Sequence, residues 1–477
     1  GGSSRPVVPG SAPAAVISAA WSPDGRAIAF VRADSLLVMP LQGGAPRLVG
    51  TESALHSCTW SPDGRWIGCV TLNHESVLLG TSFGNIAPSA IVLFPAPGGG
   101  APVRITEPRA FNQSPVFTPD GRRLLFLSDR DGPRDVYAVS LTSAGRARGE
   151  PERLSTGLDA ISISLSADAR KLAYAVYGAR SNIWSLPIPT GAPVTTAGAT
   201  PVTTGNQVIE AMRVSRDGRW LVYDSNRRGN ADIYRVPLFG RGDSPEQLTT
   251  DPADEFAPDL APPPGHAIAY HSWRTGTRDI EVKPLDGGPV ERVTDTPAQE
   301  SYPVWSPDGQ AIVFEEQTPP LRLFVTRRGP GGGRWSQPVA LTDSAYDADW
   351  SPDGRFISYV YAATDTRVRD LMVIPAAGGT PRRVVASDRP GAPLVDRARW
   401  SPDGRTLYFK SHDARGRASF WSVSATAGRG ARPRLLVRFA DPAWQSARKD
   451  FATDGRRLYF AVEDRQSDVF VADLIPR

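Results

Sequence analysis

The motif in this 477-residue chain that most resembles a reactive site is Gly80-Thr-Ser82-Phe-Gly84, which matches the Gly-x-Ser-x-Gly pattern of a nucleophile elbow. Such an elbow needs a sharp turn between a strand and a helix, with an acid and then a histidine further along the chain. Here Ser82 lies between two expected strands, in a segment with Gly, Asn and Pro, and no helical pattern follows it. We interpret the motif as a chance match and predict that this chain is not an enzyme.

Metal-binding patterns are equally weak. The segment Asp129-Arg-Asp131-Gly-Pro-Arg-Asp135 has the acidic character of a calcium loop but lacks the glutamate at the twelfth position and the alternating oxygen ligands. The five histidines show no His-x-x-x-His spacing, and the two cysteines show no Cys-x-x-Cys spacing. The sequence therefore predicts no metal and no other cofactor.

A tight turn of the type Trp-Ser-Pro-Asp-Gly-Arg, flanked by apolar runs, recurs along the whole chain. Successive turns lie 39 to 57 residues apart, which is the period of a four-stranded propeller blade. Pro presets the first dihedral angle of the turn, Asp bonds the local backbone, and Gly takes the left-handed position. Ala stands at one of these positions and is expected either to be strained or to mark a reshaped turn. The ten positions are Gly25, Gly64, Gly121, Ala169, Gly218, Gly265, Gly309, Gly354, Gly404 and Gly455.

The repeats predict an all-β fold in which residues 1–477 form a single closed propeller of ten four-stranded blades. The last blade ends after its third strand, and Gly1-Gly-Ser-Ser-Arg-Pro-Val-Val resembles a fourth-strand phrase, so the N-terminal strand is expected to complete that blade. Two smaller propellers in tandem are the alternative. Residues 71–90 are expected to form an insertion loop between the second and third strands of the second blade.

The two cysteines, Cys58 and Cys69, flank one of the turns. A type I turn with a G1 bulge would point them to opposite faces of the hairpin, and we expect this register and free, buried thiols. Without the bulge the two side chains would lie opposite each other.

Composition and charge narrow the possible partners. The formal net charge is +4, nearly all cations are Arg, and no basic run is interleaved with aromatic residues, so nucleic-acid binding is not expected. The sequence has no apolar stretch long enough to insert into a membrane. We expect a monomeric domain, and, because the sequence lacks an initiating Met, a mature form or excised domain whose targeting segment lies outside it.

Propeller geometry gathers the variable loops at one mouth of the channel, opposite the repeated turns. We expect this loop-side mouth to bind a peptide, a glycan or a protein tail, although a simple solvated rim is the alternative. Part of the insertion is expected to act as a lid, and adjacent first strands are expected to form ion pairs that join neighbouring blades. The candidate ligand-binding residues are Glu210, Asp254, Glu255, Glu300, Asp347, Arg397, Lys449, Phe83 and Asn85.

The turn phrase, together with an Ile-Tyr-Val-type third strand and a Leu-Thr ending, resembles the TolB-type propeller repeat. Segments such as Phe83-Gly-Asn-Ile-Ala-Pro-Ser are most similar to the C-terminal propellers of membrane-anchored bacterial serine/threonine kinases. The resemblance implies an extracytoplasmic sensor or protein-binding domain, tethered by a membrane segment upstream of this chain. The propeller half of a prolyl-oligopeptidase-like or amidohydrolase enzyme, and a periplasmic assembly scaffold, are the alternatives.

Overall fold

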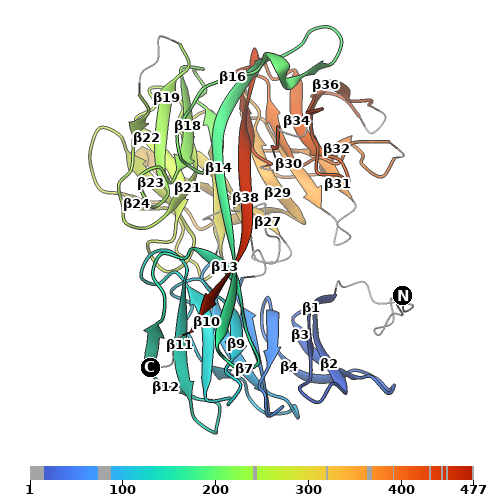
Figure 1. Ribbon diagram of the computed structural model, residues 1–477. Helices are drawn as coiled ribbons and strands as arrows, with labels where there is room; N and C mark the ends of the chain where they lie inside the picture. Colours follow the sequence, from blue (N-terminus) through green and yellow to red (C-terminus); the bar gives the residue numbers. More distant parts are fainter. Residues whose placement is uncertain are drawn as a thin grey trace. The chain divides into compact units, whose positions relative to one another are not determined.

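The computed structural model describes residues 16–73, 87–239, 244–317, 321–362, 368–389, 391–428, 431–441, 444–446 and 449–474 (Figure 1). Within these residues the protein is almost entirely β-sheet, as predicted, and its only helices are the short 3-10 turns Thr196–Gly198 and Pro330–Gly332. The chain forms two compact units. One comprises residues up to 178 and from 465 onward, and the other comprises residues 179–464.

The first unit contains three four-stranded antiparallel sheets and part of a fourth. The fourth combines β13 (Ala160–Leu165) with the first part of β14 (Lys171–Pro187) and the last part of β38 (Arg457–Asp473). The strands of the three complete sheets are β1 (Val16–Trp21), β2 (Ala27–Arg32), β3 (Ser35–Pro40) and β4 (Arg47–Thr51); β5 (His56–Trp60), β6 (Trp66–Thr71), β7 (Ala90–Pro95) and β8 (Val103–Arg104); and β9 (Asn112–Phe117), β10 (Arg123–Ser128), β11 (Asp135–Leu141) and β12 (Ala147–Arg153).

The second unit contains five sheets that each begin with an inner strand, followed in order by the next three strands of the repeat. They are β17 (Met212–Val214), β18 (Trp220–Ser225), β19 (Asp232–Pro237) and β20 (Glu246–Gln247); β21 (Glu255–Leu260), β22 (Ala267–Ser272), β23 (Asp279–Pro284) and β24 (Glu291–Arg292); β25 (Glu300–Trp305), β26 (Ala311–Glu316), β27 (Arg322–Arg327) and β28 (Val339–Asp343); β29 (Ala345–Trp350), β30 (Phe356–Ala362), β31 (Arg369–Pro375) and β32 (Arg382–Val385); and β33 (Arg397–Trp400), β34 (Thr406–His412), β35 (Ala418–Ser424) and β36 (Arg434–Arg438).

A sixth blade closes the second unit into a ring. It consists of β37 (Phe451–Thr453), the first part of β38, the last part of β14 and β16 (Thr200–Pro201), while β15 (Val194–Thr195) pairs with β36. The inner strands β17, β21, β25, β29, β33 and β37 contact one another in this order, and β37 contacts β17 again. We call this closed circle the six-bladed unit.

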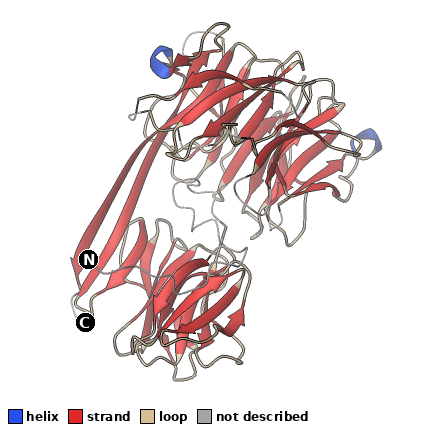
Figure 2. Ribbon diagram, turned by 90° about the vertical axis from the view of Figure 1, so that its right-hand side faces the viewer, coloured by secondary structure: helices blue, strands red, loops and turns tan. Residues whose placement is uncertain are grey.

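The described strands therefore do not form the predicted single ring of ten successive blades. The hairpins at Ala169 and Gly455 both continue as 17-residue strands, β14 and β38, which pair with each other (Figures 1 and 2). The fourth and tenth repeats consequently share one sheet, and the described residues form nine sheets. The expected pairing of Val7 and Val8 with the last blade lies outside the described residues.

The repeated turns have the predicted geometry. In one of them the Ser351 hydroxyl donates to Asp353 at 2.6 Å, the Asp353 carboxylate accepts from the Arg355 amide, and Gly354 has φ 72°. Ala169 has φ 57°, which confirms that an L-residue is held in the left-handed region there. Next to the turn, Trp350 is buried in a core shared by neighbouring sheets.

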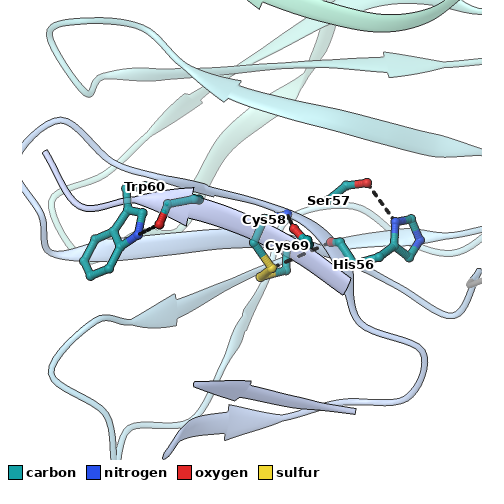
Figure 3. Close-up of a disulfide and its surroundings, with 7 residues drawn as sticks. His56, Ser57, Cys58, Trp60 and Cys69 are labelled. Carbon is teal, nitrogen blue, oxygen red and sulfur yellow. Dashed lines mark hydrogen bonds between the residues drawn. A yellow bond between two sulfur atoms is a disulfide. The ribbon is translucent and has the colours of Figure 1, made fainter. Parts of the chain in front are cut away.

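The two cysteines are joined by a disulfide, so the prediction of free thiols is wrong (Figure 3). The hairpin turn lacks the G1 bulge, because the Ser61 amide donates to the Trp66 carbonyl. This register pairs Trp60 with Ile67 and brings the Cα atoms of Cys58 and Cys69 within 4.1 Å. The irregularity in the hairpin lies between His56 and Thr59 instead.

The expected insertion lies between β6, which ends at Thr71, and β7, which begins at Ala90. Its central part, residues 74–86, lies outside the described residues. The expected lid residues Phe83 and Asn85 and the Gly80–Gly84 motif fall in that part.

Candidate functional site

The structure buries most of the predicted ligand-binding residues. Glu210, Glu255, Glu300, Asp347 and Arg397 belong to the first strands of the six-bladed unit or to the loops just before them, and all are at most 7% exposed. Their role as ligand contacts stays a prediction. Asp254 and Lys449 are half-buried. Within the described residues these side chains interact with other groups of the protein, and those interactions indicate a structural role for several of them.

Asp347 is the centre of an ion-pair network that connects three blades, which confirms the expected joining of first strands. Its carboxylate lies 3.0 Å from Arg397 and 2.8 Å from Arg399, and it accepts the Ala398 amide at 2.6 Å. Burial opposes ionisation of this carboxyl, but the two guanidinium groups outweigh burial and lower its pKa. Arg399 also pairs with Asp450 on the next blade.

Arg397 extends this network towards the loop-side mouth. Its guanidinium lies 4.0 Å from the centroid of the Tyr302 ring and 3.3 Å from Glu315. Tyr302 and Asp347 both have positive φ, at 50° and 56°, because each sits at an irregularity of its first strand. Tyr302 and Asp347 both contact Arg397 from these backbone irregularities, and no pattern in the sequence marks them.

Side chains closer to the repeated turns also reach across the axis of the six-bladed ring. Arg213 on β17 reaches Asp349 on β29 at 2.9 Å, and Arg216 donates to the carbonyl oxygen of Trp305 at 2.7 Å. Because β17 and β29 lie opposite each other in the ring of six inner strands, the first contact spans the ring. Side chains therefore fill the middle of the six-bladed unit.

At one junction between blades, two buried acids form no salt bridge with any residue in the described part of the chain. An arginine faces the aspartate at the start of the third strand in three blades, in the pairs Arg153–Asp135, Arg292–Asp279 and Arg383–Asp370. In the blade of β17 to β20, Gln247 takes that place and donates to Asp232 at 2.9 Å. Burial raises the pKa of Asp232 to about 6. The neighbouring Glu255 is also buried, which raises its pKa to about 8.

A second polar cluster was not found by sequence reasoning, because its members are widely separated in the chain. His412 contacts the Asp396 carboxylate at 2.6 Å through Nδ1 and the Ser446 carbonyl oxygen at 2.8 Å through Nε2. Lys410 donates to the Ser446 hydroxyl at 2.7 Å, and that hydroxyl donates to the Ala461 carbonyl. Ser446 is 3% exposed and its hydroxyl proton is used by a carbonyl oxygen, so this arrangement holds a loop rather than a nucleophile.

The opposite mouth of the ring, where the repeated turns meet, contains a cavity of about 470 Å³. Its lining comes from all six blades, and it therefore lies on the axis of the ring. The Arg213–Asp349 ion pair and Arg399 line its inner part, while Phe239, which is 64% exposed, and Arg456 lie on its outer part. We call this the turn-face cavity.

The packing of the turns explains why the cavity opens where it does. Around most of the ring each turn glycine lies against the turn proline of the preceding blade, as Gly309 does on Pro262, Gly354 on Pro307, Gly404 on Pro352 and Gly455 on Pro402. The last blade has Thr453 in place of that proline, and the blade of β17 has Arg216. No atom lies within 4 Å of the position where a Cβ of Gly218 would stand. The series of glycine–proline contacts between neighbouring turns is therefore interrupted at these two blades.

Two further cavities adjoin the turn-face cavity. One of about 290 Å³ lies between the blades of β17 and β21 and shares Ser215, Arg216 and Pro263 with it. Another of about 610 Å³ lies between the blades of β25 and β29 and shares Pro307 and Trp350. We call the three cavities, which share these lining residues on the turn side of the six-bladed unit, the turn-face groove. The sequence predicts a binding site at the other mouth, which stays a prediction, and it marks the turns only as structural elements.

Among the described residues no group of three or more His, Cys, Asp or Glu side chains is arranged to hold a metal ion. No helix in the same part of the chain is long and apolar enough to cross a membrane.

Comparison with known proteins gives the family. The TolB beta propeller domain family (PD40) matches residues 154–393, half of the chain. "Uncharacterized protein Atu1656" of Agrobacterium fabrum is 28% identical over 263 residues, which cover 52% of this chain and 84% of that protein.

Solved structures resemble the chain more distantly. TolB from Acinetobacter baumannii is 15% identical with a TM-score of 0.31, over 86% of this chain and 79% of that one. Oligogalacturonate lyase from Vibrio parahaemolyticus is 13% identical with a TM-score of 0.39, over 78% of this chain and 93% of that one.

Proposed function

Because this chain belongs to the TolB beta propeller domain family, whose fold serves many functions, we propose from its site that it is a binding module and not an enzyme. Its ligand is an extended polypeptide segment of a partner protein, bound at the turn-face cavity. The observation that carries this proposal is the cavity itself, whose volume of about 470 Å³ falls within the range of ligand sites and whose lining comes from six blades.

The arrangement of charged groups favours binding over catalysis. The central carboxylates are neutralised by arginines, as Asp347 is by Arg397 and Arg399, and such pairs hold blades together. Catalysis would instead need a nucleophile or an acid and base aimed at open space. The groove also suits a chain-like ligand, because it continues from the axis between the blades on two sides.

The disulfide supports an extracytoplasmic location. Disulfides persist in oxidising compartments such as the periplasm and the cell surface. A sensor role in a membrane-anchored serine/threonine kinase is the finer proposal, and it rests on the sequence resemblance described above. Expression of a tagged full-length protein, followed by fractionation and protease accessibility of intact cells, tests the location.

Selection from a random peptide library displayed on phage, with the folded protein as bait, tests the binding proposal. Selected peptides are then titrated by fluorescence anisotropy against the wild type, a turn-face variant and a loop-side variant. We expect Phe239→Ala to weaken binding at least fivefold and Glu300→Gln to leave it within twofold. Failure to select any peptide, or loss of binding only in Glu300→Gln, would overturn the proposal.

A further inference from the structure

Three arginines that form no salt bridge within the described residues line the turn side of the six-bladed unit, and a buried acid close to one of them, Asp259, interacts with both Arg213 and Arg216. Arg216 lines both the turn-face cavity and the cavity beside it, and its guanidinium donates to a backbone carbonyl oxygen. Arg219 lines the adjoining cavity and Arg456 the turn-face cavity, and both are exposed. Among the described residues, none of these three arginines has an acidic partner within ion-pair distance.

The aspartates of the same lining are already occupied by donors of the protein. Asp217 accepts the Ser215 hydroxyl and the Arg219 amide, so its carboxylate is part of its own turn. Asp454 accepts two backbone amides through Oδ1 and the hydroxyl of Tyr459 through Oδ2.

The two deeper carboxylates are occupied as well. Asp259 accepts the Trp305 amide, and Asp349 accepts both Arg213 and the Trp400 amide. A carboxylate that accepts two or three hydrogen bonds keeps its charge but has only one or two of its roughly four acceptor sites left for a ligand. Only Asp286, at the outer end of the adjoining cavity, is an exposed acid of the lining without such bonds in the described part of the chain.

Guanidinium groups with free donors bind carboxylates in a two-pronged geometry that ammonium groups cannot offer. We propose that the turn-face groove recognises an extended acidic segment of a partner polypeptide, with Arg216, Arg219 and Arg456 as its carboxylate contacts. This inference rests on the proposed function, because it names the ligand class for the same groove. The exposed ring of Phe239 and the turn prolines supply apolar contact between the charged positions.

Short fluorescein-labelled peptides of alternating Glu and Gly, Gln and Gly, or Lys and Gly test this inference by fluorescence anisotropy. We expect the Glu peptide to bind at least tenfold more tightly than the Gln peptide, and the Lys peptide to show no binding. Raising the salt concentration from about 50 to 500 mM is expected to weaken the Glu peptide strongly, because salt screens exposed charge pairs.

Charge reversal locates the site. Arg216→Glu combined with Arg219→Glu is expected to weaken the Glu peptide at least tenfold, whereas Arg146→Glu, an exposed arginine of the first unit, is expected to leave it within twofold. Because Arg216 also donates to the Trp305 carbonyl oxygen, a second double variant, Arg219→Glu with Arg456→Glu, leaves that hydrogen bond intact. Circular dichroism checks that each variant is folded. Equal binding of the Glu and Gln peptides, or an equal effect of Arg146→Glu, would overturn the inference.

The two proposals can fail separately. If the peptides selected on phage bind at the turn face but are not acidic, this inference is wrong and the proposed function stands. If the selected peptides bind away from the turn face, the proposed function is wrong, and this inference falls with it.

Discussion

Arg213 Nη1 lies 2.9 Å from Asp349 Oδ1, and the two residues belong to inner strands that face each other across the ring of six blades. Both side chains are 12% exposed, and they are 136 residues apart in the chain. The ion pair thus joins opposite sides of the ring and forms the inner wall of the turn-face cavity.

Replacing one partner of this ion pair is expected to lower the free energy of unfolding more than replacing both partners. Arg213→Met leaves a largely buried carboxylate without its cation, and we expect the free energy of unfolding to fall by about 3 kcal/mol. Arg213→Met combined with Asp349→Leu is expected to lose less than the sum of the two single variants. Urea denaturation of the four proteins measures the coupling, and additive losses would show that the contact contributes nothing to stability.

The buried glutamates predict that stability falls as the pH rises from 6.5 to 8. Burial raises the pKa of Glu255 to about 8 and that of Glu300 to about 7, whereas an unfolded chain has them near 4.5. Between these values the folded protein holds protons that the unfolded chain has released, so each step up in pH favours unfolding. We expect a loss of about 2 kcal/mol over this interval, measured by urea denaturation at each pH.

Glu255→Gln tests the origin of that dependence. The amide resembles the protonated carboxyl, and the variant is expected to lose most of the pH dependence while remaining at least as stable as the wild type at pH 8. Glu107→Gln, on the exposed surface, is the matched control and is expected to retain the dependence. The same slope in Glu255→Gln as in the wild type would contradict the assignment.

The repeated turns allow opposite substitutions at equivalent positions. Gly354 and Ala169 both have positive φ, at 72° and 57°. Gly354→Ala is expected to lower the free energy of unfolding by about 1 kcal/mol, and Ala169→Gly is expected to raise it by about 0.5–1 kcal/mol. Thermal denaturation should therefore shift in opposite directions, and a shift in the same direction would mean that backbone strain does not decide the effect.

The disulfide gives a chemical prediction. Cys58 and Cys69 are separated by 11 residues, and a loop of this size implies a stabilisation of about 3 kcal/mol. The denatured protein is expected to show no reactive thiol before reduction and two after it, in a colorimetric thiol assay. Cys58→Ala with Cys69→Ala is expected to lower the melting temperature, and reactive thiols in the unreduced protein would refute the bond.

Short-range features of the fold were predictable from the sequence. The turn phrase predicts φ above zero at Gly354 and Ala169, and the aromatic residue before it predicts a buried side chain at Trp350. These features depend on local turn chemistry and on a period of two, which a single repeat already contains.

Long-range features were not predictable in the same way. Closure of the six-bladed unit depends on whether the hairpin at Gly455 ends after a short strand or continues as β38 to pair with β14, and no residue type marks that choice. Whether Cys58 and Cys69 lie opposite each other depends on the position of one β-bulge, which the sequence allows either at the turn or within the strand. The turn-face cavity depends on which blades lack a turn proline, and this matters only once Thr453 and Arg216 are known to belong to adjacent blades of one ring.

Hydrogen exchange measured by mass spectrometry, with and without a peptide selected on phage, tests the binding account most directly. We predict that the peptide slows amide exchange in residues 213–219 and 452–456, on the turn side of the six-bladed unit. Exchange in residues 254–256 and 298–301, at the loop-side mouth, is predicted to stay unchanged. Protection confined to the loop-side segments would contradict the account and place the binding site at the other end of the ring.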